Sequence, residues 1–91
     1  MNDKLKDWRK QIDDIDEDIL AFLAERMKIV GEIGKFKRLH SIALLDEKRW
    51  QKVLESKLSK ANGLNLSEKF VQKLYDLIHQ HSLEIEKNSK L

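Results

Sequence analysis

The chain has 91 residues, of which 37% are charged, and its formal net charge at pH 7 is +2. It contains no cysteine, so neither disulfides nor thiolate metal sites can support its core. A hydrophobic share of 41% is too high for a disordered tail, and so small a net charge gives no argument for binding nucleic acid. Without a membrane-spanning apolar run or an apolar signal core, we expect one cytoplasmic domain over residues 1–91.

Apolar residues recur at seven-residue intervals in two columns along the first part of the chain. One column begins at Leu5 and is interrupted only by Arg26, and the other begins at Trp8 and ends at Phe36. This period predicts one helix over about residues 3–39, which would be about 55 Å long. Since that is about twice the diameter expected of a domain of this size, two shorter helices cannot cover the whole stripe. We therefore expect the helix to pack against a second copy of itself.

Two shorter helices are predicted in the rest of the chain, which makes the fold class all-α. Asp46 is suited to cap a helix over about residues 47–61, and Asn62-Gly63 is a typical helix stop. Asn65 with Glu68 has the pattern of a capping box for a third helix, which runs to about residue 87. The inner faces of these two helices are predicted to carry Trp50, Val53, Leu54, Leu58, Leu66, Phe70, Leu74, Leu77, Ile78 and Ile85.

Arg26 occupies a position at which an aliphatic residue would be more stable. An unpaired buried cation costs several kcal/mol, so Arg26 must reach water, pair with a glutamate of a partner chain, or bind an anionic ligand. Lys37 follows within about 20° of the same helix face and about 16 Å along the axis, although a lysine near a helix end is also common. Gly31 and Gly34, between the two cations, each cost about 1 kcal/mol in a helix and indicate close approach by another backbone or a ligand.

Arg9 precedes Arg26 by seventeen residues, about 25 Å of helix, and cannot reach the same ligand within one chain. In an antiparallel pairing of two first helices it could reach the ligand of the other chain. The alternative is an ordinary surface pair with Asp13 at i+4. Two cations on a partly apolar face, with a third from a second copy, would suit a small ligand that carries several negative charges.

The remaining polar candidates are less distinctive. Asp46 and Arg49 are i, i+3 neighbours that could pair with each other, and Ser82 and Glu86 are i, i+4 neighbours near the end of the third helix. The three histidines lack a matching set of ligands, so we interpret them as structural or exposed and predict no metal site. Any catalysis would rest on positioning and electrostatics, without a cofactor.

Three segments of this chain together resemble the all-helical chorismate mutase family: WRKQIDDIDEDILAFLAERMKIVGEIGKFK, LLDEKRW and LYDLIHQHSLEIE. The resemblance covers about residues 5–87 and is specific, because cations at fixed positions interrupt an apolar stripe. It implies an intertwined homodimer with two sites, each built from both chains. The implied activity is that of an isomerase of the shikimate pathway, which converts chorismate to prephenate by a one-step pericyclic rearrangement in phenylalanine and tyrosine biosynthesis.

The resemblance also implies roles for individual residues. Lys37 and Glu86 would be catalytic, because both would donate to the ether oxygen as its bond breaks. The residues that would bind substrate are Arg26 and the partner chain's Arg9 for the two carboxylates, Asp46 for the ring hydroxyl, and Arg49 and Ser82 for the ring carboxylate.

The chain departs from the family pattern at two positions. Trp50 stands where the family commonly has a glutamate that contacts the ring hydroxyl, and Glu86 stands where many members have glutamine. A glutamate donates a hydrogen bond only when it is protonated. The Arg49-Trp50 pair looks similar to mutase domains that are fused or docked to DAHP synthase, so that enzyme is a possible partner.

Two alternative functions remain at this point. An isochorismate pyruvate lyase uses a similar cationic cage on the same scaffold, and it would not need the missing glutamate. A weakly active regulatory dimer that docks to DAHP synthase could also keep the cage. Asp46 and the segment DEKRW favour the mutase.

Overall fold

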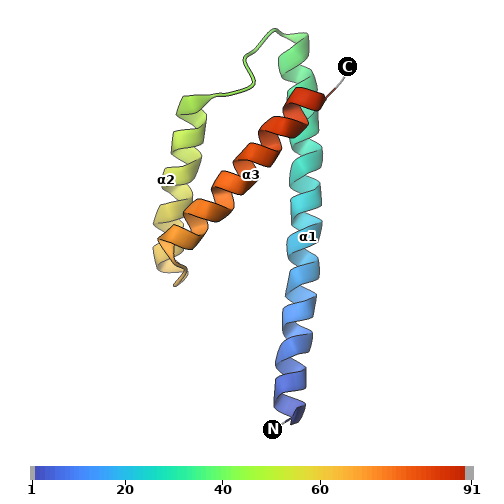
Figure 1. The fold of residues 1–91 in the computed structure, drawn as a ribbon, viewed down its shortest axis with the longest axis vertical. Coiled ribbons are helices and arrows are strands. Elements are labelled where there is room, and N and C mark those ends of the chain that lie inside the picture. Colours follow the sequence, from blue (N-terminus) through green and yellow to red (C-terminus); the bar gives the residue numbers. More distant parts are fainter. Residues whose placement is uncertain (1, 90–91) are drawn as a thin grey trace.

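The computed structural model describes residues 2–89 and contains three helices: α1 (Asn2–Leu39), α2 (Glu47–Gly63) and α3 (Glu68–Asn88). No residue within 2–89 belongs to a strand. The all-α prediction with one very long first helix is therefore confirmed (Figure 1). None of the helices in this part of the chain is long and apolar enough to cross a membrane.

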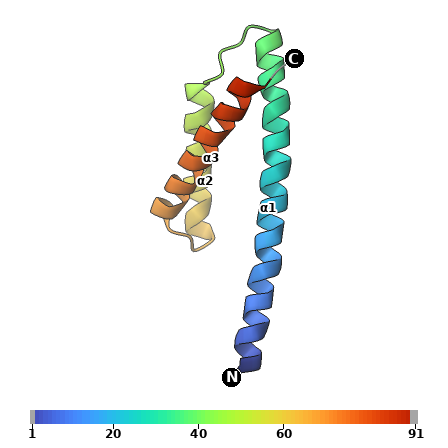
Figure 2. The same cartoon turned by 45° about the vertical axis from the view of Figure 1, so that its right-hand side comes forward.

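The length of α1 determines the shape of the molecule. Its 38 residues give a helix about 57 Å long, close to the longest dimension of the whole structure, 59 Å. α3 packs against both α1 and α2, and it meets α1 only along the second half of that helix. The first half extends beyond α2 and α3 in both views (Figures 1 and 2). The radius of gyration, 16.9 Å, accordingly exceeds the value of about 12 Å expected for a compact chain of this length.

The predicted cap of α2 is confirmed, whereas that of α3 is wrong. Asp46 Oδ1 accepts a hydrogen bond of 3.0 Å from the backbone N–H of Arg49, which satisfies one free donor of the first turn. At α3 the cap is Ser67, whose Oγ accepts a 3.2 Å hydrogen bond from the N–H of Phe70. Asn65 cannot cap α3 because it still belongs to the end of α2.

α2 ends at a left-handed residue two positions later than the sequence predicted. Asn65, and not Gly63, has the positive φ, 57°. The N–H of Leu66 then donates to the carbonyl of Ala61 over 2.9 Å, which is the six-to-one bond of a Schellman motif. Asparagine tolerates this conformation better than most residues. α1 ends in the same way, with Ser41 at φ 55°.

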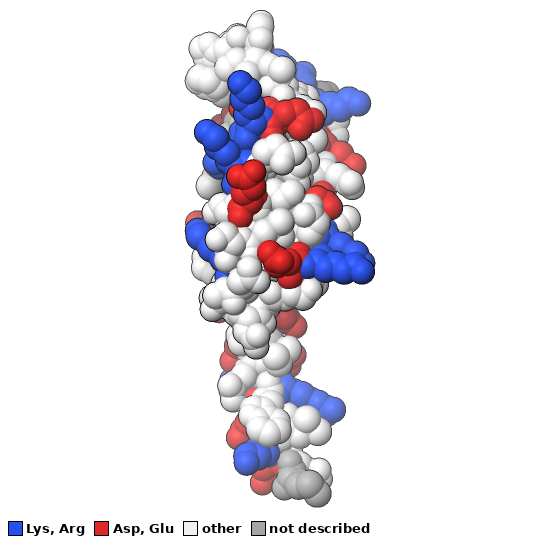
Figure 3. Space-filling view, turned by 90° about the vertical axis from the view of Figure 1, so that its left-hand side faces the viewer, with Lys and Arg blue, Asp and Glu red and all other residues white. Residues whose placement is uncertain are grey.

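A single chain buries very little apolar surface. Its buried hydrophobic residues are Val30, Ala61 and Val71, and none of the large side chains described is fully buried. The stripe of α1 is exposed along its length, and Figure 3 shows uncharged surface between charged side chains on the projecting half. Four residues that were predicted to be buried are exposed in the single chain: Leu66 (45%), Phe70 (56%), Leu74 (40%) and Leu77 (66%).

The crossing of α1 and α3 depends on Gly34. A Cβ atom at this position would lie 2.7 Å from Cα and 2.9 Å from the carbonyl oxygen of Glu86, which is too close for a real contact. The predicted approach of another backbone is therefore confirmed at Gly34. At Gly31 the nearest atom to an added Cβ is the Ile85 side chain at 3.9 Å, so that glycine has room for a methyl group.

The two glycines should therefore respond oppositely to alanine. We expect Gly34→Ala to lower the free energy of unfolding by about 1–3 kcal/mol, because backbone atoms of α3 must move away. Gly31→Ala should raise it by up to about 1 kcal/mol through helix propensity. Urea denaturation followed by circular dichroism measures both, and equal effects at the two positions would contradict the backbone contact.

Candidate active site

A cavity of about 270 Å³ lies where the three helices and the α1–α2 connection meet. Its lining combines apolar side chains with cations and carboxylates from all three helices. The lining residues are Arg26, Val30, Ile33, Lys37, Leu44, Asp46, Arg49, Trp50, Val53, His79, Ser82, Leu83 and Glu86. Six of the seven residues singled out from the sequence are thus together at one site.

Arg26 points into this cavity and is held by α3. Its Nη1 donates a hydrogen bond of 2.6 Å to Oγ of Ser82, a residue that is only 6% exposed. The Ser82 hydroxyl in turn donates to the carbonyl of Ile78 over 2.7 Å. A hydroxyl has one proton, so Ser82 uses its proton for the backbone and a lone pair for the guanidinium. No carboxylate pairs with Arg26 among the described residues, which leaves the charge available to an anionic ligand.

Lys37 and Glu86 form a largely buried ion pair at the other end of the cavity. The ammonium of Lys37 lies 2.7 Å from Glu86 Oε1, and the two side chains are 18% and 9% exposed. Lys37 also donates to the carbonyl of Leu44 over 2.6 Å. Glu86 Oε1 is within ion-pair distance of the ammonium, but the two groups are not aligned for a hydrogen bond. This oxygen accepts no hydrogen bond from residues 2–89. Of the three N–H groups of the ammonium, one donates to the carbonyl of Leu44, which leaves the other two for a ligand or for Glu86.

Asp46 and Arg49 line the cavity from the first turn of α2. One oxygen of the Asp46 carboxylate accepts the capping bond from the Arg49 N–H, and the second is left for a ligand or water. The Arg49 guanidinium donates no hydrogen bond to a described residue. The capping bond thus fixes the backbone at the start of α2, while the second Asp46 oxygen and the Arg49 guanidinium remain available to a ligand.

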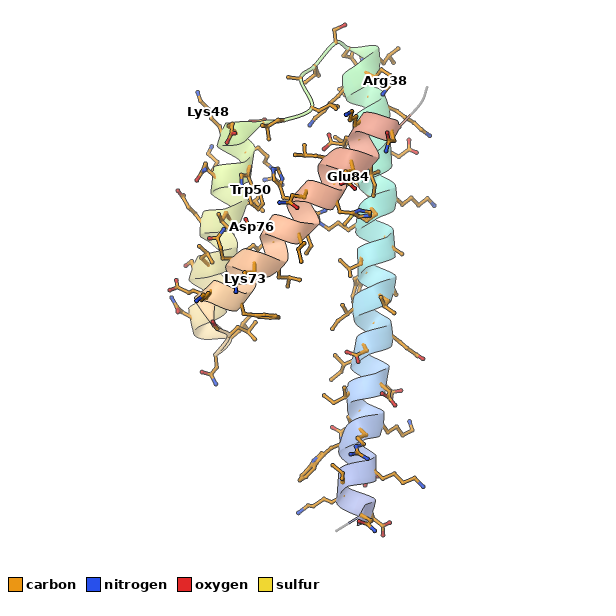
Figure 4. All side chains as sticks on the ribbon, in the orientation of Figure 1. Arg38, Lys48, Trp50, Lys73, Asp76 and Glu84 are labelled. Atoms are coloured by element: carbon orange, nitrogen blue, oxygen red, sulfur yellow. The ribbon has the colours of Figure 1, made fainter. Side chains whose placement is uncertain are left out.

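Trp50 and His79 form an aromatic stack across the cavity wall. Trp50 projects from α2 toward α3 (Figure 4), and its ring lies parallel to that of His79, with 3.9 Å between centroids and 7° between planes. His79 was not predicted to lie in the site. The spacing along the helix could have indicated it. His79 lies three positions before Ser82 and seven before Glu86, so it shares their helix face.

Arg9 does not reach this cavity within its own chain. It lines a separate hollow near the start of α1 with Asn2, Leu5 and Asp13, among others. The cavity therefore contains Arg26, Lys37 and Arg49 as its cations, and no group of three or more histidine or acidic residues within 2–89 is arranged to hold a metal ion.

The buried ion pair gives a stability prediction. Lys37→Met should destabilise the protein by about 3 kcal/mol, because it leaves the Glu86 carboxylate buried without its cation. The double variant Lys37→Met/Glu86→Leu should recover most of that loss, since it removes both charges. Chemical denaturation of the three proteins measures this cycle, and a double variant no more stable than Lys37→Met would contradict it.

Comparison with known proteins places the chain in a family. The family model described as chorismate mutase type II matches residues 8–87. The chain is 30% identical over 86 residues to the bifunctional chorismate mutase/prephenate dehydratase of Buchnera aphidicola and 32% identical over 75 residues to that of Escherichia coli K12. These alignments cover 94% and 82% of the chain but only 22% and 19% of the two relatives, so the chain spans about a fifth of their length.

A relative of similar length is the chorismate mutase of Methanocaldococcus jannaschii, with 26% identity over 87 residues. That alignment covers 96% of the chain and 88% of the relative. The helical architecture, the inward cations and the match over nearly the whole chain agree with one another. The chain belongs to the chorismate mutase type II family.

Proposed function

We propose that the chain is a chorismate mutase, an isomerase that converts chorismate to prephenate by an intramolecular pericyclic rearrangement. The observation that carries the proposal is the cavity in which Arg26, Lys37 and Arg49 converge with Asp46 and Glu86. A dianionic substrate supplies the carboxylate partners that Arg26 and Arg49 lack among the described residues. The reaction needs no nucleophile or cofactor, because binding the compact conformer and stabilising charge in the transition state are sufficient.

Lys37 is the group best placed to stabilise the transition state. The breaking ether bond leaves negative charge on its oxygen, and a fixed, largely buried ammonium stabilises that charge strongly. The contacts of Lys37 with Leu44 and Glu86 support this role, because they hold the ammonium in place before substrate binds. Glu86 can add a second donor when it is protonated.

The substrate groups can be assigned to the two ends of the cavity. Arg26 and Arg49 would bind carboxylates, for which the planar guanidinium is well suited. The free oxygen of Asp46 would accept from the ring hydroxyl. Ser82 would act mainly by orienting Arg26, since its proton is donated to Ile78, and it would contact the ring carboxylate only after the hydroxyl rotates.

The complete enzyme would be a homodimer in which each site uses both chains. The exposed stripe of α1 and the small core of a single chain support this proposal, because a stable fold needs that stripe covered. An antiparallel arrangement that places Arg9 of the partner subunit beside Arg26 pairs each residue i with residue 35−i. In that register four facing pairs are apolar on both sides: Leu5 with Val30, Trp8 with Met27, Ile12 with Leu23, and Ile15 with Leu20.

Three finer expectations stay predictions. A cytoplasmic location accords with the biosynthetic family but rests on that family alone. The association with DAHP synthase rests on the Arg49-Trp50 pair, and co-purification of the two proteins would test it. The single-domain boundary at residues 1–91 can be tested by limited proteolysis.

A direct assay tests the activity. The purified chain should deplete chorismate and form prephenate, and Arg26→Leu should remove nearly all of this activity while the circular dichroism spectrum is retained. Salicylate formed from isochorismate would instead indicate the lyase. Binding of chorismate without turnover would indicate a regulatory module.

Complementation between two inactive variants tests the shared site. Arg9→Ala and Lys37→Ala should each be nearly inactive, because each removes one cation from every site. Mixing them after unfolding and refolding should restore about a quarter of the wild-type sites, since random pairing gives hybrid dimers with one intact site. No recovery in mixtures that contain hybrid dimers, as shown by a tag on one variant, would contradict a site built from two chains.

A further inference from the structure

His79 is a polar group in the cavity to which the residue assignments above give no role. It is half-buried on α3, among the residues that line the cavity. Its ring nitrogens make no hydrogen bond with any residue in the range 2–89. An imidazole always has at least one N–H to donate, so the cavity holds a donor without a partner among the described residues.

The stack with Trp50 fixes the plane of this imidazole. With ring centroids 3.9 Å apart and planes within 7°, the indole covers one face of His79. Both ring nitrogens lie at the edge of the imidazole, so stacking leaves them free to form hydrogen bonds. A donor whose plane is already fixed loses less conformational entropy when a ligand binds. Trp50 therefore does more than fill space in this wall.

The position of His79 along α3 indicates which part of a ligand it meets. Glu86, Ser82 and His79 follow one another on the same face, with about 6 Å and then about 4.5 Å of helix rise between them. His79 therefore lies on the far side of Ser82 from the Lys37–Glu86 pair. Ser82 holds Arg26, and Arg26 and Arg49 together line an adjoining hollow with Tyr75, which lies one turn before His79 on α3. This end of the cavity therefore carries two guanidinium groups. Such surroundings favour an anionic group.

We propose that His79, oriented by Trp50, donates a hydrogen bond to the substrate carboxylate at the Arg26–Arg49 end of the cavity. His79 is then a substrate-binding residue and Trp50 a positioning residue. The inference rests on the proposed function, because it takes chorismate as the ligand. This proposal explains why Trp50 is compatible with a site for an anion. The indole does not itself contact the carboxylate, but it holds the His79 imidazole, which does.

The decisive variant is His79→Phe, which keeps an aromatic ring for the stack and removes both nitrogens. We expect the KM for chorismate to rise about ten-fold, as for loss of one hydrogen bond to a charged group, with kcat changed less than about two-fold. The matched control is His40→Phe. His40 also packs on an aromatic ring, Phe36 at 4.2 Å, but it lies outside the cavity, so its KM should equal that of the wild type.

The role of Trp50 needs its own variants. Trp50→Leu should raise KM because the imidazole is no longer held, whereas Trp50→Phe should restore most of the affinity by restoring a stack. In the double variant Trp50→Leu/His79→Phe, KM should be no higher than in His79→Phe alone, because the tryptophan acts through the histidine. Additive effects of the two substitutions would overturn that part of the inference.

The outcomes separate this inference from the proposed function. If the wild type converts chorismate and His79→Phe has the same KM, the inference is wrong and the mutase proposal stands. A purely structural role of His79 predicts that result, since the stack is kept. If the wild type neither converts nor binds chorismate by calorimetry, both proposals fail. If it binds without turnover, the dissociation constants of the same variants decide the inference.

Discussion

The close contact between the backbones of α1 and α3 at Gly34 and Glu86 determines the geometry of the site. With 2.7 Å between an added Cβ and Glu86 Cα, no residue with a side chain fits there without moving α3. This contact sets how far along α1 the third helix crosses. Three residues beyond Gly34, Lys37 then lies within 2.7 Å of the Glu86 carboxylate. A larger residue at the crossing would separate the pair and widen the cavity at its Lys37–Glu86 end.

The site is built around charges that the chain itself does not neutralise. Lys37 has an acidic partner, but the guanidinium of Arg26 is bonded to a hydroxyl and that of Arg49 donates to no described residue. Holding cations apart from anions costs free energy, and binding an anionic ligand offsets that cost. The same cost explains why the cations lie at a cavity that a small molecule can enter. A purely structural helix would place aliphatic residues at these positions.

The helix pattern and the shared face of Arg26 and Lys37 could be predicted from the sequence because both follow from helical geometry. The places of Asp46, Arg49, Ser82 and Glu86 in the site were expected only from the family resemblance. The spacing of Arg26 and Lys37 places them on one face of any α-helix, and Asp46 caps α2 by a local hydrogen bond. The cap predicted at Asn65 was wrong, and the position of His79 in the cavity was not predicted, for a different reason. Whether Asn65 starts one helix or ends another depends on the path of the connection, and the role of His79 depends on which ring from α2 faces it.

The sequence by itself determined three helices, a first helix too long for one chain to cover, and inward cations along it, because these properties depend on residue spacing within a helix. Only the tertiary structure decided how α3 crosses α1, which residues close the cavity, and that Trp50 stacks on His79. Those features join residues far apart in the chain, and their distances depend on side-chain packing between helices. Local spacing carries no information about such contacts.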